Sequence, residues 1–555
     1  MRRMLSRPGR PRSLAAVAAF VLVVPLGLTA CTSGDAGSPA ETSATGPAGA
    51  PLQLEGILDT GFNVEVDGFG FPNYGNEGEV ENLNPYSMRL LFGDQVCAQF
   101  DGEDCLLTPT AEQWMAVQND SMAGGHCFGM AGLAWALFAG YIDPQAYGAE
   151  VPAQVPFEAN WDLQADIATV FVTQATDPTS AERRTASPNQ ALEVLSQAWA
   201  EEQGYVFGIY RFVDGEYLDG HAVTPYAIED LGDGQVGIML YDNNFPFEAQ
   251  MMVVDTTTDT WTYSTSADPR NDPELYEGGA DNPLELFPVD PMLGPQDCSF
   301  CTTGTVNDAA GLGAVPGLAG TSTAAGEVNV VYLNQEAAGL GVTISVSDLD
   351  GNAIEGLREW VPMSRVITSA PVIAVPKDEP FVVTVDAADA VAEATTGITI
   401  IGPGYSYGIE DFLMSPGDVD SIIFDPDSSS VTYMTSVGSA PDIVLSLDGS
   451  QASYGFLFGG LDLPGEGGAI TVFLDPESQT VTALTTTDGD ASIDFVIRRI
   501  DDVSDEEYTS DPIPLSANES LVIEYGAWQG DGTIMPIGID INDDGFIDED
   551  LIETD

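Results

Sequence analysis

Apolar and polar residues follow two different periods along the first half of the chain. Helix-like runs predict helices over residues 111–117, 127–138 and 189–203, and in the last of these the apolar residues recur every three or four positions. After residue 204 the runs become strand-like, and turn-forming residues separate them into predicted strands over 205–213, 221–231, 235–244 and 249–264. Helices followed by strands predict an α+β domain over residues 51–297, with the helices packed on an antiparallel sheet.

The second half of the chain has a different pattern. A linker rich in Gly, Ala and Thr is expected over residues 298–325, and short strand-like runs follow at close intervals. Such runs with few amphipathic helices predict all-β sandwich modules, which we place at residues 326–410 and 411–555. Residues 424–435 and 474–485 share the pattern D-P-[DE]-S-x-[ST]-V-T-x-x-T, which predicts one type of hairpin used twice.

The amino terminus carries a processing pattern. Five arginines lie among the first twelve residues, an apolar run covers residues 14–28, and the letters LTAC end at Cys31. The apolar run is shorter than the ~20 residues that a membrane span needs. The pattern resembles a bacterial lipoprotein signal, which implies a signal peptide over residues 1–30 and a lipid on Cys31. Residues 31–50 are small and Pro-containing, as in a flexible tether. We therefore expect an exported protein anchored by its lipid to the outer face of the bacterial cytoplasmic membrane.

Charge narrows the set of partners. The chain has 87 Asp and Glu against 15 Lys and Arg, a net charge of −72. Nucleic acid and anionic membrane surfaces would repel such a protein, so we expect no nucleic-acid partner and membrane contact only through the lipid. A solvated acidic surface explains the charge more simply than a specific acidic site, and the composition leaves the oligomeric state open.

The cysteine count singles out one thiol. Six cysteines are present, and lipidation of Cys31 would leave five. Cysteines outside the cytoplasm tend to pair. We expect local disulfides between Cys97 and Cys105 and between Cys298 and Cys301, which leaves Cys127 unpaired. One C-x-x-C and two histidines do not make a zinc site.

Cys127 stands at the start of a predicted helix, directly after Gly124, Gly125 and His126. Backbone N–H groups and the helix dipole favour a thiolate at this position. The alternative is a buried structural cysteine. His221, expected at a strand start, is the candidate base, because the only other histidine is His126. We assign His126 a local hydrogen-bonding or substrate-wall role.

The end of the next strand offers a group that could orient His221. Asp242, Asn243 and Asn244 follow one another there, and strand alternation puts Asp242 and Asn244 on one face. We prefer Asp242 because it still lies within the strand pattern, with Asn243 and Asn244 as alternatives. The competing interpretation is a turn rich in Asx residues.

Cysteine at a helix start, histidine on a strand and Asp or Asn after the next strand resemble the papain-like cysteine peptidase superfamily. The GHAV and YDNN segments are most similar to its bacterial branch of double-glycine leader peptidases, over roughly residues 85–265. The resemblance implies a papain-like fold, a peptide or protein substrate, no catalytic cofactor, and Cys127, His221 and Asp242 as nucleophile, base and orienting group. It also implies a glutamine that helps to bind the oxyanion. Gln118 is the candidate, although it lies farther upstream than in the family, and Asn119 is its rival. The backbone N–H of Cys127 would be the second donor.

A second motif stands near the carboxyl terminus. Asp540, Asn542, Asp544 and Asp548 match the first nine positions of a calcium loop, but Leu551 stands where a bidentate Glu is expected. A Ca²⁺ site and a solvated acidic turn are both compatible with this pattern.

Three functions remain open from the sequence. The first is a surface-anchored thiol hydrolase that cleaves peptide or amide bonds through a thioester. The second is a non-catalytic surface binding or adhesion lipoprotein that uses the same fold as a scaffold. The third is a transglutaminase-like acyl transferase, in which an amine instead of water resolves the thioester.

Overall fold

The structure is a computed structural model that describes residues 58–101, 104–213, 216–302, 312, 326–360, 371–465, 467–485, 491–516, 519–530, 533–541 and 547–551. The predicted signal peptide, Cys31 and the tether lie outside these residues. Within the described ranges, no helix combines the length and the apolar character that crossing a membrane requires.

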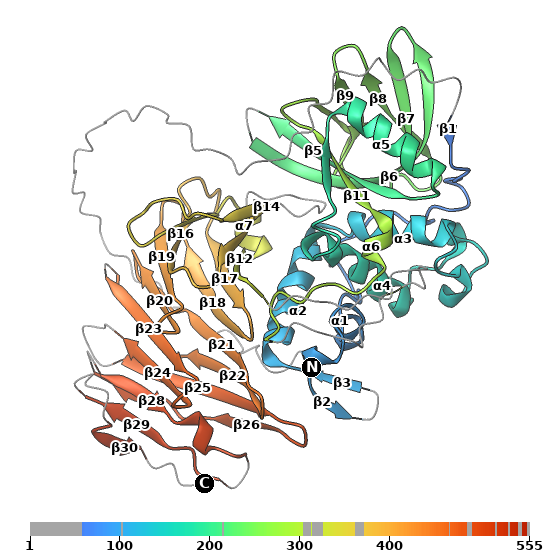
Figure 1. The fold of residues 1–555 in the computed structure, drawn as a ribbon. Helices are drawn as coiled ribbons and strands as arrows, with labels where there is room; N and C mark the ends of the chain where they lie inside the picture. Colours follow the sequence, from blue (N-terminus) through green and yellow to red (C-terminus); the bar gives the residue numbers. More distant parts are fainter. Residues whose placement is uncertain are drawn as a thin grey trace, which may run out of the picture. The chain divides into compact units, whose positions relative to one another are not determined.

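The first half contains most of the helices (Figure 1). They are α1 (Pro85–Phe92), α2 (Pro109–Ser121), α3 (Cys127–Phe138), α4 (Trp161–Val172), α5 (Pro188–Ala200) and the short α6 (Val289–Met292). The prediction for α3 is confirmed to the residue, and α2 and α5 are confirmed with shifted ends. Both begin with a proline after a capping side chain, Thr108 for α2 and Ser187 for α5.

The α4 helix was not predicted from the sequence. Nine of its twelve residues are buried, so the helix has no polar face that would produce an amphipathic period. It packs closely on α3 because α3 carries Gly129 and Gly132 at the contact. A Cβ added at Gly129 would lie 2.0 Å from the carbonyl oxygen of Ile167 on α4.

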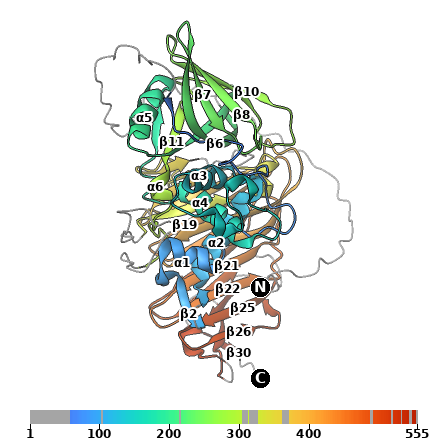
Figure 2. The same cartoon turned by 90° about the vertical axis from the view of Figure 1, so that its right-hand side faces the viewer.

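One antiparallel sheet accompanies these helices. Its strands are β4 (Arg184–Ala186), β5 (Tyr205–Val213), β6 (Glu216–Gly232), β7 (Gln235–Tyr241), β8 (Ala249–Asp255), β9 (Thr260–Thr265), β10 (Glu274–Gly278) and β11 (Leu284–Pro288), in the order β10-β9-β8-β7-β6-β5-β11-β4, with β1 (Leu58–Asp59) paired to β6. Apolar residues of α5 share a core with β5, β6 and β7, so α5 covers one face of the sheet. Figures 1 and 2 both show α3 beside β6 and α4 beside α3. The predicted α+β arrangement of helices on an antiparallel sheet is therefore confirmed, and the papain-like fold is not.

Two large antiparallel sheets make up the second half, together with the short helix α7 (Gln335–Gly339). The first contains β12 (Val328–Leu333), β14 (Arg358–Trp360), β15 (Val372–Pro376), β17 (Ala394–Gly402), β18 (Tyr405–Met414), β21 (Asp442–Asp448), β22 (Ser453–Gly459), β25 (Ala491–Ile500), β26 (Asp505–Thr509) and β27 (Ile513–Leu515). The second contains β13 (Thr343–Ser347), β16 (Phe381–Asp386), β19 (Val419–Asp425), β20 (Ser430–Thr435), β23 (Gly468–Asp475), β24 (Thr480–Thr485), β28 (Ser520–Ile523), β29 (Ile537–Asp540) and β30 (Glu549–Leu551).

Both sheets contribute to one hydrophobic core, so the predicted all-β sandwich character is confirmed. The expected boundary between residues 410 and 411 differs from what the structure shows, because it falls inside β18. Each sheet draws strands from both sides of that position. The described residues from 326 onward form one sandwich in place of two modules.

The shared hairpin pattern has a structural basis. In β19–β20 the carboxylate of Asp425 accepts from the N–H of Asp427 and the hydroxyl of Ser428, and Asp475 does the same at β23–β24 with Glu477 and Ser478. Each turn then places one residue at positive φ, Ser429 at 49° and Gln479 at 57°. The prediction of one hairpin type used twice is confirmed.

A third hairpin of this type joins β8 and β9, and the sequence comparison missed it. Asp255 accepts from Thr257, and Asp259 has a φ of 55°. Its letters VDTTTDTWT lack the Pro and Ser of the other two turns.

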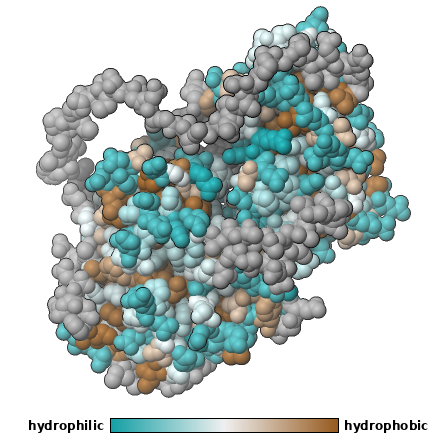
Figure 3. All heavy atoms as spheres, in the orientation of Figure 1, coloured by the Kyte–Doolittle hydropathy of each residue, from teal (hydrophilic) through white to brown (hydrophobic). Residues whose placement is uncertain are grey.

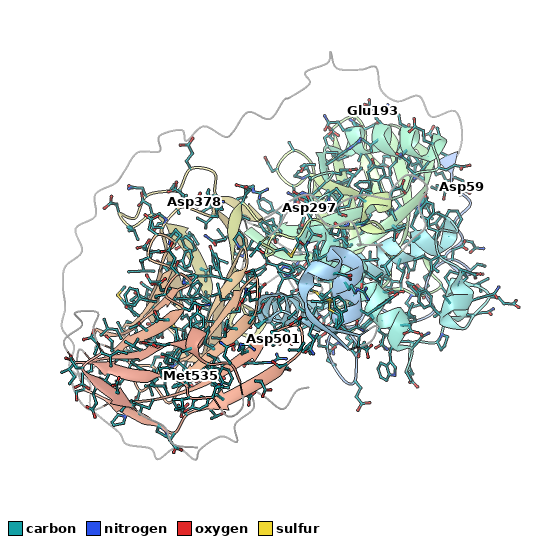
Figure 4. All side chains as sticks on the ribbon, turned by 60° about the horizontal axis from the view of Figure 1, so that its bottom comes forward. Asp59, Glu193, Asp297, Asp378, Asp501 and Met535 are labelled. Carbon is teal, nitrogen blue, oxygen red and sulfur yellow. A yellow bond between two sulfur atoms is a disulfide. The ribbon has the colours of Figure 1, made fainter. Side chains whose placement is uncertain are left out.

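The described surface is mainly polar. Figure 3 shows hydrophilic residues over most of one face, with apolar residues scattered among them. Acidic side chains such as Asp59, Glu193 and Asp378 are exposed at its edges (Figure 4). Exposed carboxylates of this kind support the interpretation of the net charge as a solvated acidic surface.

Candidate active site

The start of α3 positions the candidate nucleophile. Gly125 has φ 145° and ψ 169°, a conformation that favours glycine, and it turns the chain into the helix. His126 is the N-cap and Cys127 the first helical residue, and no side chain caps the helix through the N-cap position. The N–H of Cys127 has no acceptor within the helix. Cys127 is a free thiol with 0% exposure, as the cysteine count predicted.

The candidate base, His221, lies on β6, and this strand packs against α3. Thr224 on β6 donates a hydrogen bond of 3.0 Å to the carbonyl of Ala131 on α3 and so fixes strand against helix. His221 lies in the interior of β6 opposite Ile209 of β5. It was expected at a strand start, but β6 begins five residues earlier. The His221 side chain is fully buried.

Asp242 directly follows β7 and reaches His221 because of the strand register. Thr224 pairs with Tyr241, so in an antiparallel ladder residues 221 and 242 are diagonal neighbours on one face. The distance between Nε2 of His221 and Oδ1 of Asp242 is 2.7 Å. The carboxylate also accepts from the backbone N–H of Asn244 at 2.8 Å and from the hydroxyls of Tyr263 at 2.6 Å and Thr265 at 2.8 Å.

These contacts set the charge states of the pair. Burial raises the pKa of Asp242, but the charge and hydrogen bond of His221 and the other donors outweigh it and hold the pKa below its usual value. Burial lowers the pKa of His221, but the Asp242 carboxylate, with a smaller contribution from Cys127, raises it to about 10. An imidazolium paired with a carboxylate is therefore favoured at neutral pH.

The ring of His221 lies between Asp242 and Cys127. Its Nε2 forms a hydrogen bond with Asp242, and its Nδ1 is buried without a hydrogen bond of standard geometry. The Cys127 thiol nevertheless interacts with the ring closely enough to help raise the pKa of His221. The structure thus brings together the three residues that the sequence singled out.

Asn243 and Asn244 have other partners. The amide of Asn243 donates to the carbonyls of Cys127 at 3.0 Å and Ala222 at 3.1 Å, so it joins the start of α3 to β6. The amide of Asn244 donates to the carbonyl of Ser266. In this structure the orienting partner of His221 is Asp242, and neither alternative takes that place.

The structure does not bring Gln118 to the triad. Gln118 is buried on α2, where its side chain forms a hydrogen bond with Tyr332 of β12. Asn119 is also engaged, because its amide accepts from the N–H of Leu83 and donates to the carbonyl of Leu83. Neither arrangement supports the expected part in oxyanion binding.

His126 has the local hydrogen-bonding role that we expected. Its Nδ1 lies 2.8 Å from the carbonyl of Tyr74, and its Nε2 lies 2.9 Å from Oδ1 of Asn82. The amide nitrogen of Asn82 faces Oδ1 of Asn76, which fixes the orientation of that amide. Both ring nitrogens therefore face oxygen atoms of the neighbouring segment. The ring stacks on Tyr74 with centroids 4.1 Å apart.

Sequence reasoning missed the second layer of the site. Tyr263 and Thr265 lie two positions apart on β9 and present their hydroxyls to Asp242. The sequence did contain a signal for them: Tyr263 and Thr265 alternate with Trp261 along the strand, so their hydroxyls lie on a strand face that is otherwise apolar. Asn73, which accepts from the N–H of His126 at 2.9 Å, carried no such signal.

The triad is closed from solvent. Cys127, His221 and Asp242 all have 0% exposure. Four cavities among the described residues have none of the three as a lining residue. A substrate would reach the thiol only after the surrounding segments move.

The other predicted sites have separate outcomes. The disulfides Cys97–Cys105 and Cys298–Cys301 are both present, as predicted. In the calcium-like loop, Asp540 ends β29, and Asp548 accepts from the N–H of Ile541 at 3.1 Å. Asn542 and Asp544 lie outside the described residues, so the calcium site stays a prediction. Within the described ranges, no group of three His, Cys, Asp or Glu side chains could hold a metal ion.

No family model, curated protein or solved structure matches this chain. The resemblance to papain-like peptidases stays a prediction from the sequence. Function is therefore inferred from the site itself.

Proposed function

We propose that this protein is a thiol hydrolase that cleaves peptide or amide bonds with Cys127, His221 and Asp242. One observation carries the proposal: a single buried histidine ring interacts with a carboxylate on one side and with the free thiol on the other. This is the arrangement that nucleophilic catalysis requires, with nucleophile and base in contact and the base oriented by a third group.

The charge states support the chemistry. With the pKa of His221 raised, the ring holds a proton that it can give to a leaving amine. Cys127 Sγ would attack the amide carbon, and collapse of the tetrahedral intermediate would break the C–N bond as His221 protonates the amine. Water would then attack the thioester carbon and give a proton to His221, and collapse of the second intermediate would break the C–S bond, releasing the acid and the Cys127 sulfur.

Asp242 would keep the ring in place through both steps. Its four hydrogen bonds hold the carboxylate, which in turn directs Nε2 toward itself and leaves Nδ1 for the sulfur. No metal or cofactor enters these steps.

We also propose that the protein is exported and anchored by a lipid on Cys31. The amino-terminal pattern supports this, and the two disulfides are typical of proteins outside the cytoplasm.

The test is a set of electrophilic thiol probes, such as peptide vinyl sulfones, applied to the folded protein. The proposal predicts labelling that is lost in Cys127→Ala and strongly reduced in His221→Ala. A Ser196→Ala variant is a suitable control, because Ser196 on α5 bonds only within its own helix. Labelling that persists in Cys127→Ala, or no labelling of the wild type by any probe, would refute the proposal.

The closure of the site favours a second candidate, a non-catalytic binding lipoprotein in which the triad is structural. Its distinguishing result is a folded wild type whose thiol reacts with small electrophiles only after denaturation. In that case the buried ion pair would serve stability alone.

A further inference from the structure

Asn73 lies between the two halves of the candidate site. Its backbone N–H donates to the carbonyl of Asn243 at 2.8 Å, directly after Asp242. Its side-chain Oδ1 accepts from the N–H of His126 at 2.9 Å, directly before Cys127. Asn243 closes the loop by donating to the carbonyl of Cys127. Asn73 is therefore fixed at backbone and side chain beside the nucleophile.

The nitrogen of the same side chain has no partner. Asn73 is 3% exposed, and its Nδ2 is buried without a hydrogen bond. Among the described residues it is the one buried carboxamide whose nitrogen is left in this state. A buried donor without an acceptor is unfavourable, and a functional role is one recognised reason for such a group to persist.

A second donor lies close to this nitrogen. The Cys127 N–H, at the start of α3, has no acceptor within the helix. Because Oδ1 and Nδ2 share one amide carbon, Nδ2 lies next to the oxygen that holds the His126 N–H, one residue from the Cys127 N–H. Nδ2 of Asn73 and the N–H of Cys127 therefore both lie at the entry into α3, where the helix dipole favours negative charge.

The other side-chain amides that could be considered as oxyanion donors already have hydrogen-bond partners. Gln118 bonds to Tyr332, and Asn119 bonds to Leu83 through both ends of its amide. The amide of Asn243 already donates to two carbonyls.

We propose that Nδ2 of Asn73 and the backbone N–H of Cys127 form the oxyanion hole of the thiol hydrolase. When Sγ bonds to the substrate carbon, the carbonyl electron pair moves to oxygen, and the two N–H groups donate to that oxyanion. When the intermediate collapses, the pair returns and the leaving group departs. This assignment rests on the proposed function and makes Asn73 a catalytic residue.

The experiment compares two reactions of the same thiol. Iodoacetamide alkylates the thiolate by direct displacement and forms no oxyanion, whereas p-nitrophenyl acetate acylates it through a tetrahedral oxyanion. Loss of one oxyanion donor lowers the rate of oxyanion-forming steps by roughly 100-fold to 1000-fold. For Asn73→Ala we expect this loss in the p-nitrophenolate burst, with an alkylation rate within about twofold of the wild type.

The Asn73→Asp variant separates the N–H donor of the Asn73 side chain from its oxygen, which holds the His126 N–H. Aspartate keeps an oxygen for the His126 N–H but replaces the N–H donor with an acceptor, so we expect acylation as slow as in Asn73→Ala. A p-nitrophenolate burst in Asn73→Asp equal to that of the wild type would overturn the proposal. Asn282→Ala is the matched control, because Asn282 is also 3% exposed and its amide donates to Tyr210 and Glu277 away from the triad. It should lower the melting temperature and leave both rates unchanged.

The same two reactions distinguish a failure of the proposed thiol hydrolase function from a failure of the oxyanion hole. A wild type that reacts with neither reagent overturns the proposed function and the oxyanion hole together. A wild type that is acylated as fast as Asn73→Ala overturns the oxyanion hole alone. Equal slowing of both reactions in Asn73→Ala would show that Asn73 shapes the thiol–imidazole pair, and this too overturns the assignment.

Discussion

Replacing Asp242 with Asn tests the buried pair at the centre of the site. The substitution keeps the side-chain shape but removes the negative charge and one acceptor oxygen. Four donors face the carboxylate, two at each oxygen. The single oxygen of Asn serves one pair, and the other pair then meets an amide N–H₂. His221 loses the charge that offsets its burial.

The size of the effect follows from two independent arguments. Breaking a buried ion pair by removing one partner costs ~3–5 kcal/mol. The pKa of His221 is raised from 6.5 to about 10, and at neutral pH that shift corresponds to ~4 kcal/mol at ~1.4 kcal/mol per unit. Both arguments give an unfolding free energy that is lower by about 3–5 kcal/mol, a large fraction of the ~5–15 kcal/mol that is typical.

The pH dependence has a defined sign. A raised His221 pKa gives stability that is fully present below 6.5 and lost as pH rises through about 10. A lowered Asp242 pKa gives stability that is present above 3.8 and lost as pH falls through the lowered value. The wild type should therefore exceed Asp242→Asn most between these limits, and the difference should shrink as pH approaches 10.

Urea unfolding followed by tryptophan fluorescence measures this difference. Five of the seven tryptophans lie before residue 302, so the signal reports mainly on the half that contains the site. Asp348→Asn is the control, because Asp348 accepts several hydrogen bonds but lies at the surface, away from both histidines. Equal midpoints for wild type and Asp242→Asn at every pH would refute the reasoning.

Three further predictions concern other parts of the chain. Burial raises the pKa of Asp448, which accepts from Thr108 at 3.0 Å, to about 6, so its contribution to stability is present below 3.8 and lost as pH rises through about 6. Asp448→Asn should flatten this dependence in melting curves, and parallel curves would contradict it. Gly129→Ala should destabilise the protein by at least ~2 kcal/mol, because the added Cβ would overlap Ile167. Gly455→Ala should be tolerated, because the nearest atom to its added Cβ is 3.6 Å away. Equal melting temperatures for the two variants would contradict the packing argument. Added CaCl₂ should raise the melting temperature and EDTA should reverse it, with Asp544→Asn abolishing the response; a melting temperature indifferent to both would favour a solvated acidic turn.

The sequence predicted most of the fold where periodicity was strong. The α5 helix and the strand β9 stand out because their apolar residues recur with a clear period. The α4 helix did not, since burial on nearly every side leaves no polar face. The single sandwich after residue 326 was also missed, because the residues of one strand do not indicate which of two sheets the strand joins.

The site was predictable to the extent that rare residues marked it. Two histidines and one leftover thiol in a chain of this length pointed to Cys127 and His221. Asn73 carries no comparable mark, because its role depends on contacts with His126 and Asn243, far away in sequence. Gln118 was proposed from resemblance alone, and the packing of α2 turns it toward Tyr332.

The most direct test of the central claim is the reaction of the folded protein with iodoacetamide, followed by peptide mapping. We expect one adduct, on Cys127, that forms while the protein is folded at neutral pH and forms more slowly in His221→Ala. A Cys127 that reacts only after unfolding, or equally fast without His221, would contradict it.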